Sequence, residues 1–380
     1  MRCSSVVRRG ALSFLAFVII LMSVSVSYAM TKEEALKELE KMGINLDNPS
    51  FIGTVKQGKL NLIKVFLDAG MDPNSRDRSE GATVLMMMTK KGNTKVVKML
   101  VDAGADVNAV NNSGDTALLT AVSANKNDIV ELLLKGGADT TLLNEKNETA
   151  LHVAARTGNA VIIKTLLDAG VDINMDAKGI TPIMLAGISG NDNAIKLFLD
   201  KSKNDDVKLK GLSRALFNAV NVNSIKGVKL FLDFGADPSA YKGNEDKYRS
   251  PVISATVKDY NDIVKLLVDA GANVNHLDRY NESVLMIAFE KRKMVAAKII
   301  FTAKDLDVNV NVDGQTLLHY VVSDVHKEDG DELAFIKLLL EKTPDLDIER
   351  DKDDRTPLEI AKDRKLSKVI KLLEDAGAKQ

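Results

Sequence analysis

The feature that most constrains this chain is a repeat with a period of about 33 residues. A threonine or serine followed by an apolar run recurs with spacings of 33, 33, 32, 32, 37, 33, 33 and 40 residues. One more unit begins one period upstream, at Pro49–Phe51. The pattern predicts ten units, and since one such unit cannot bury its own apolar faces, the units must stack to form a core. The recurring positions are Thr83, Thr116, Thr149, Thr181, Ser213, Ser250, Ser283, Thr316 and Thr356.

Each unit has the same internal order of turns and apolar segments. A turn is followed by a short apolar helix, a second turn, a longer apolar helix and an exit of the form A-G-A-D-x-N. The clearest copies are GDTALLTAVSANKNDIVELLLKGGAD and NETALHVAARTGNAVIIKTLLDAGVDIN. The first turn holds glycine or asparagine in most copies, for example Gly81, Gly114, Asn147 and Asn281. Both residue types tolerate positive φ, so we predict a left-handed residue at this position.

These residues resemble the ankyrin repeat, G-x-T-P-L-H-x-A-A-x-x-G-x-x-x-I-V-x-x-L-L-x-x-G-A-D-x-N, over about residues 49–379. The resemblance implies an all-α ankyrin-repeat solenoid of about ten helix-turn-helix units with β-turn or hairpin fingers, at residues 49–380. His152 and His319 stand at the histidine of this pattern. By resemblance each imidazole hydrogen-bonds across the turn to the neighbouring unit. The resemblance also implies a non-catalytic protein-protein interaction scaffold that uses its fingertips and inner helices.

Both ends of the array have the polar character that terminal repeats need. Residues 30–48 are expected to form an N-terminal capping helix, because Thr31 is followed three residues later by Glu34 in the capping-box pattern. At the other end, charged residues including Lys368, Lys371 and Glu374 are expected on the exposed side of the last helix.

The repeat becomes more degenerate after about residue 200. Repeats five and eight lack their closing glycine, and extra residues occur around 241–247 and 323–333. Insertions in repeat proteins map to loops, which often carry specificity, although a solenoid also tolerates extra surface residues without function. Since the period is kept across residues 201–206, we predict a continuous stack there and no hinge.

The N-terminal segment has the order of a secretory signal peptide. Three arginines precede the apolar run Ala11–Val26, which ends in Ser27–Ala29 with small residues at the positions that a signal peptidase reads. We expect residues 1–29 to be removed, so that the mature chain begins at Met30 and is periplasmic or secreted, as in a bacterium. The alternative is an uncleaved membrane anchor, because the apolar run is only slightly shorter than a bilayer span.

The residue types that carry most chemistry are scarce. The one cysteine, Cys3, lies in the expected leader, and the chain has only four histidines. No phosphate-binding loop, G-x-G-x-x-G, H-E-x-x-H or G-x-S-x-G motif occurs. The formal net charge of −1 gives no excess of positive charge for a nucleic-acid backbone. We therefore expect no enzyme, no cofactor, no metal site and no nucleic-acid partner.

Two neighbouring fingers concentrate the residue types that are enriched at binding hot spots. The finger of repeat seven has Tyr241, Tyr248 and Arg249. The finger of repeat eight has Arg279 and Tyr280. The chain has six tyrosines in all, so this concentration predicts the contact centre for a protein partner. The alternative is that Tyr248 only packs against the extra loop.

Three fingertip cations complete the predicted protein-binding surface, Lys146, Lys178 and Lys210. We expect a monomer that binds a protein of unknown identity and contacts a membrane only if residues 1–29 are retained. A different class of function remains open, that of a secreted effector or virulence factor acting on the proteins of another cell. The two differ in location, since an effector would leave the cell that makes it.

Overall fold

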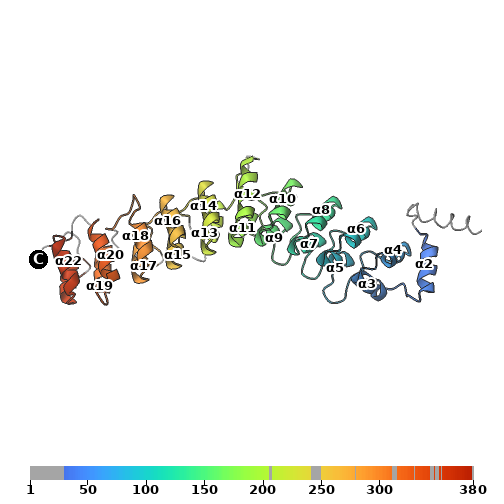
Figure 1. Ribbon diagram of the computed structural model, residues 1–380, viewed down its shortest axis with the longest axis horizontal. Helices are drawn as coiled ribbons and strands as arrows, with labels where there is room; N and C mark the ends of the chain where they lie inside the picture. Colours follow the sequence, from blue (N-terminus) through green and yellow to red (C-terminus); the bar gives the residue numbers. More distant parts are fainter. Residues whose placement is uncertain are drawn as a thin grey trace, which may run out of the picture. The chain divides into compact units, whose positions relative to one another are not determined.

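The computed structural model describes residues 30–204, 208–240, 250–278, 280–309, 315–328, 330–342, 346, 351 and 353–378. These residues form helices α2 to α22 joined by turns, without a strand (Figure 1). Isolated β-bridges close three of the fingers, at Arg76 and Thr83, at Ala177 and Ile180, and at Leu277 and Ser283. The all-α class with turn-like fingers is thus confirmed.

Among the described residues, ten pairs of helices follow the N-terminal helix α2 (Lys32–Lys41). The first helices of the pairs are α3 (Asn48–Gln57), α5 (Val84–Lys91), α7 (Ala117–Ser123), α9 (Ala150–Thr157), α11 (Pro182–Ser189), α13 (Leu212–Asn221), α15 (Pro251–Val257), α17 (Val284–Glu290), α19 (Leu317–Asp324) and α21 (Pro357–Asp363). The second helices are α4 (Leu60–Asp68), α6 (Thr94–Asp102), α8 (Asn127–Lys135), α10 (Ala160–Asp168), α12 (Asp192–Asn204), α14 (Ile225–Asp233), α16 (Asn261–Asp269), α18 (Met294–Ile300), α20 (Gly330–Leu340) and α22 (Ser367–Asp375).

The described residues fall into two compact units, one ending at Asn112 and the other beginning at Ser113. In the second unit every first helix packs on the next first helix, and every second helix packs on the next second helix. Figure 1 shows these two rows, with α8 to α20 along one side of the unit and α7 to α19 along the other. The contacts of α11 with α13 and of α12 with α14 continue across residues 205–207, so this unit is continuous where a hinge was considered.

The recurring threonine or serine caps most first helices. The Thr83 hydroxyl accepts a hydrogen bond from the amide of Met86 at 3.2 Å, and Thr116 accepts one from Leu119 at 3.1 Å. Such a side chain satisfies one of the four amides that a helix N-terminus leaves without an intrahelical partner. Gly92 then ends its helix at φ 76°, in the left-handed region that glycine enters without strain.

The expected left-handed position in the first turn is present in the repeats that the structure describes there. Asn147 has φ 58° and Asn281 has φ 62°, as the sequence predicts. Asp354, whose residue type did not suggest this conformation, also has φ 61°. A short polar side chain that can hydrogen-bond locally makes this conformation accessible without glycine.

Repeat six begins differently from most other repeats, because Ser213 is not the cap of its first helix. Helix α13 starts at Leu212, and its N-cap is Gly211 at φ 76°. The carbonyl of Gly211 accepts the first intrahelical hydrogen bond, from the amide of Ala215 at 2.9 Å. The glycine, which has the positive φ expected at this turn, thus starts the helix before the serine is reached.

The terminal helices have the polar character that was predicted. The Thr31 hydroxyl accepts from the Glu34 amide at 3.3 Å, and the Glu34 carboxylate accepts from the Thr31 amide at 2.8 Å, which completes the capping box. Helix α2 packs on α4 and buries only Ala35 and Leu39. In α22 only Val369 and Leu373 are wholly buried, and its lysines face solvent. No helix in the described part of the chain is long and apolar enough to cross a bilayer.

The insertion around residues 323–333 connects three repeats. The Glu328 carboxylate accepts hydrogen bonds from the amides of Lys368 at 2.6 Å and Val369 at 2.9 Å, and so caps α22 of repeat ten. The Glu332 carboxylate forms an ion pair with Arg292 of repeat eight at 3.0 Å. These contacts give this part of the insertion a structural role. The residues around 241–247 lie outside the described residues.

Replacing Glu328 with alanine is expected to lower the free energy of unfolding by about 1 kcal/mol, because two amides at the start of α22 lose their acceptor. Glutamine, which keeps an acceptor oxygen without the charge, should lose less. Urea denaturation of the full chain measures both changes. Glu341→Ala, at an exposed position of the same repeat, is the control. An alanine variant as stable as the control would show that Glu328 does not cap α22.

Candidate partner-binding surface

The predicted site residues fall into two groups in the structure. Lys146, Lys178 and Lys210 are exposed at the fingers of three successive repeats, and none of them lines the pocket described below. Tyr280 is 62% exposed, which is high for a large aromatic side chain. Four other predicted residues lie outside the described residues, and their role stays a prediction: Tyr241, Tyr248, Arg249 and Arg279.

A pocket of about 340 Å³ lies beside Tyr280, between the first helices of repeats seven and eight. Its apolar wall is formed by Ile253 and Val257 of α15 and by Ile287 of α17. The finger of repeat eight and the end of α17 add polar residues, which are Asp278, Glu282, Glu290 and Lys291. We call this site the Tyr280 pocket.

The finger that carries Tyr280 is held by a buried carboxylate. Asp278 is 7% exposed, and its side chain accepts hydrogen bonds from the amides of Tyr280 at 2.7 Å and Glu282 at 3.2 Å. This bonding fixes the backbone on both sides of the left-handed Asn281. The exposed tyrosine and the neighbouring glutamate are therefore placed by the turn itself.

The Tyr280 pocket has an excess of negative charge among the described residues. Burial raises the pKa of Glu282, and the charges of Glu290 and Asp278 raise it further. Burial also raises the pKa of Tyr320, on α19, to about 12, with added contributions from Glu282, Asp324 and Glu290. Acidic groups of repeats eight and nine thus raise the pKa values of two neighbouring side chains, Glu282 and Tyr320.

The nearby lysines are engaged elsewhere. Lys291 forms an ion pair with Glu290 at 2.5 Å. Lys258, at the end of α15, donates hydrogen bonds to the backbone carbonyl of Asn221 at 2.9 Å and to its side chain at 3.0 Å. The charge of Lys291 lowers the pKa of Glu282, but no ion pair joins the two side chains.

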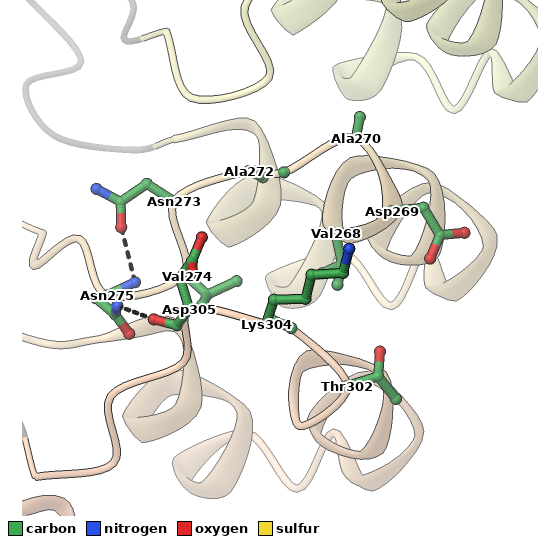
Figure 2. A pocket seen from close by; sticks show the side chains of 12 residues that line it. Val268, Asp269, Ala270, Ala272, Asn273, Val274, Asn275, Thr302, Lys304 and Asp305 are labelled. Carbon is green, nitrogen blue, oxygen red and sulfur yellow. Dashed lines mark hydrogen bonds between the residues drawn. The ribbon is translucent and has the colours of Figure 1, made fainter.

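A second pocket, of about 520 Å³, lies at the ends of α16 and α18 (Figure 2). Its polar groups hold neighbouring repeats together. The side-chain amide of Asn275 donates to the backbone carbonyl of Asp305 at 2.5 Å, and its oxygen accepts from the backbone amide of Asp307 at 2.9 Å. Asp269 pairs with Lys265 at 3.0 Å. Because these groups already form hydrogen bonds or ion pairs within the protein, this pocket has fewer polar groups available to a partner than the Tyr280 pocket has.

Hydrogen bonds of the same kind explain the asparagine that ends the A-G-A-D-x-N exit of a repeat. Asn74 accepts from the amide of Asp106 at 2.7 Å, and Asn174 accepts from that of Lys210 at 2.9 Å, each one repeat further on. An asparagine side chain can donate and accept at once, so it joins two backbone segments. This residue is therefore structural at Asn74, Asn174 and Asn275.

His152 and His319 have the bridging role that the resemblance implied. His152 Nε2 lies 2.9 Å from the carbonyl oxygen of Ile180 in the next finger, and its Nδ1 lies 2.8 Å from the Thr149 hydroxyl. His319 Nε2 lies 3.1 Å from the carbonyl oxygen of Arg355. Because a carbonyl only accepts, each Nε2 carries the proton.

No group of three or more histidine, cysteine, aspartate or glutamate side chains that could hold a metal ion occurs within the described ranges. The pocket that stands out has an apolar wall, an exposed tyrosine and a surplus of carboxylates. Its acidic residues and Tyr320 were absent from the predicted site. The available signal was the presence of two glutamates at the two ends of one helix, Glu282 just before its cap and Glu290 as its last residue.

Comparisons with known proteins agree with this architecture. A family model described as ankyrin repeats (3 copies) matches residues 51–144, 121–210 and 216–312, which is more than half of the chain. The nuclear factor NF-kappa-B p105 subunit of Gallus gallus is 31% identical over 120 residues, 30% of this chain and 12% of that protein. A B-cell lymphoma 3 protein homolog of Mus musculus is 31% identical over 134 residues, 34% of this chain and 29% of that protein.

These matches span less than a third of either relative's own length, so they concern the repeats and not the whole proteins. Among solved structures, the human ASB11 ankyrin repeat domain is similar with a TM-score of 0.52 and 22% identity. The similarity covers 60% of this chain and 100% of that domain, and it shows the fold alone. The helix pairs, their capping residues and the matched family model all lead to one conclusion, that the chain belongs to the ankyrin-repeat family.

Proposed function

We propose that this protein is a non-catalytic scaffold that binds another protein through the finger side of repeats seven to nine. Ankyrin repeats generally mediate protein-protein interaction. The observation that carries the location is Tyr280, a tyrosine that is 62% exposed beside a pocket with an apolar wall. Tyrosine offers a large, stiff contact surface with a polar tip, which is why it is enriched at binding hot spots.

The proposal includes export. Residues 1–29 have the order of a signal peptide, with arginines, an apolar run and a small-x-small ending before Met30. A mature chain that begins at Met30 would have no cysteine, which suits an oxidising compartment such as the bacterial periplasm. The partner would then be a protein of the cell envelope.

Expression of the chain with its own leader in a Gram-negative bacterium tests both parts. The cells are fractionated, the N-terminus of the product is read, and lysine crosslinks in the native fraction are mapped by mass spectrometry. The proposal expects a periplasmic chain starting at Met30 that is crosslinked to one envelope protein through repeats seven to nine.

Other outcomes would change the proposal in defined ways. A chain that keeps residues 1–29 in the membrane fraction would mean an anchored protein. A chain released into the medium would favour the secreted effector. A periplasmic chain whose crosslinks all map to repeats one to five would contradict the proposed contact surface.

A further inference from the structure

Two positions, one just before the first helix and one in its last turn, lie close to each other in repeats four and ten. One is the residue just before the capping threonine or serine, and the other is seven residues after the cap. In repeat four they are Glu148 and Arg156, which form a bidentate ion pair with distances of 2.8 and 3.1 Å. In repeat ten they are Arg355 and Asp363, whose charged atoms lie 3.9 Å apart. Both repeats therefore place opposite charges at these positions.

Repeat eight has two acids at these positions. Glu282 precedes the capping Ser283, and Glu290 follows it by seven residues. The carboxylate of Glu290 is paired with Lys291, whereas that of Glu282 forms no hydrogen bond or ion pair with any described residue. Lys291 acts on Glu282 through its charge, but no described residue forms with Glu282 the ion pair that Arg156 forms with Glu148.

The surroundings of this place suit the stem of a long cationic side chain. Ile253, Val257 and Ile287 form an apolar wall against which the methylene groups of a lysine or arginine can pack. Tyr280 presents its exposed ring at the same pocket, and a ring face attracts a cation. Glu282 and Glu290 of this pocket, together with Asp324, also raise the pKa of Tyr320 on the neighbouring repeat.

We infer that the Tyr280 pocket binds the cationic side chain of an arginine or lysine presented by a protein partner. The cation lies beside Glu282 as Arg156 lies beside Glu148, in a charge-assisted hydrogen bond that no described residue forms with Glu282. The stem packs on the apolar wall and the flanking residues of the partner contact Tyr280. This inference rests on the proposed function and names the chemistry of the partner.

The first test concerns the charges in the free protein. Glu290→Arg restores opposite charges at the two positions, so it is expected to raise the Tm of the full chain by about 1–3 °C. Arg156→Glu is the matched variant, which creates the two-acid arrangement in repeat four and should lower the Tm. A Glu290→Arg chain with a lowered or unchanged Tm would contradict the uncompensated charge on which the inference depends.

The second test measures binding directly. Two acetylated peptides, identical except for arginine or neutral citrulline at the centre, are titrated into the mature chain with labelled isoleucine methyl groups, up to millimolar concentration. The arginine peptide should shift the methyl signals of Ile253 and Ile287, and the citrulline peptide should bind about 10-fold more weakly. The double variant Glu282→Gln/Glu290→Gln should remove this difference.

Equal shifts with the two peptides, or no shift with either, would overturn the inference. Its failure can be told apart from failure of the proposed function. If a protein partner crosslinks specifically at Tyr280 but binds the double variant as tightly as the parent, the scaffold role stands and the cationic anchor is wrong. If no partner contacts Tyr280, both are wrong.

Discussion

Replacing His152 with alanine is expected to lower the free energy of unfolding by about 2–4 kcal/mol. The imidazole is fully buried and joins the Thr149 hydroxyl to the carbonyl of Ile180 in the next repeat. Its removal takes one of two donors from this carbonyl, which also accepts from the amide of Ala177 at 3.0 Å, and leaves a cavity beside the Thr149 hydroxyl. Urea denaturation at pH 7.5 measures the loss. His326→Ala, at an exposed histidine, should change stability little.

The same histidine gives a defined pH dependence. Burial lowers the pKa of His152 below its ordinary value of 6.5. As the pH falls below 6.5, the unfolded chain gains a proton at this position that the folded chain does not bind, so stability falls. Replacement with glutamine should therefore make the decline between pH 7.5 and 5.5 shallower. If the His152→Gln variant loses stability with falling pH as steeply as the parent, the imidazole of His152 is not the neutral, buried group described here.

Replacing Gly187 with alanine is expected to destabilise the fold by about 1–3 kcal/mol. Gly187 lies in α11, where it faces the backbone of α13. A Cβ atom there would lie 3.0 Å from the carbonyl carbon and 3.1 Å from the Cα of Ala215, and closer still to its carbonyl oxygen. These are backbone atoms, which cannot move without shifting the helix. Denaturation of the full chain measures the effect.

Gly53 is the matched control for this substitution. It also lies within a first helix, α3, but a Cβ at Gly53 would meet nothing within 4 Å. Gly53→Ala should therefore stabilise the chain by up to about 1 kcal/mol, because alanine favours the helix. A Gly187→Ala variant that is stabilised like Gly53→Ala would show that α11 and α13 are not in backbone contact.

The period and the capping residues predicted most of the fold, because the same local chemistry recurs in each unit. The threonine at the start of a first helix, the left-handed glycine or asparagine before it and the bridging histidines all act over a few residues or one repeat. In repeat six the recurring residue, Ser213, lies in the first turn of the helix, because Gly211 starts the helix earlier. A period alone does not distinguish a cap from a residue in the first turn.

Contacts that join distant positions could not be predicted from the sequence. Nothing in residues 323–333 indicates that Glu328 reaches the amides of α22, 40 residues further on. Gly187 appears only as a glycine within an apolar helix, without the close approach that explains it. Tyr280 was found from its residue type, whereas the significance of Glu282 required the geometry of Glu148 and Arg156 in another repeat.

The most direct test of the binding surface is site-specific photocrosslinking in the fraction where the protein is found. A photoreactive phenylalanine is placed at Tyr280, and, as a control, at Val161 of α10, which is 56% exposed on a second helix. We expect one discrete protein adduct at position 280, weakened by Glu282→Gln/Glu290→Gln, and none at position 161. Adducts of equal yield at both positions, or an adduct at position 161 alone, would contradict the account.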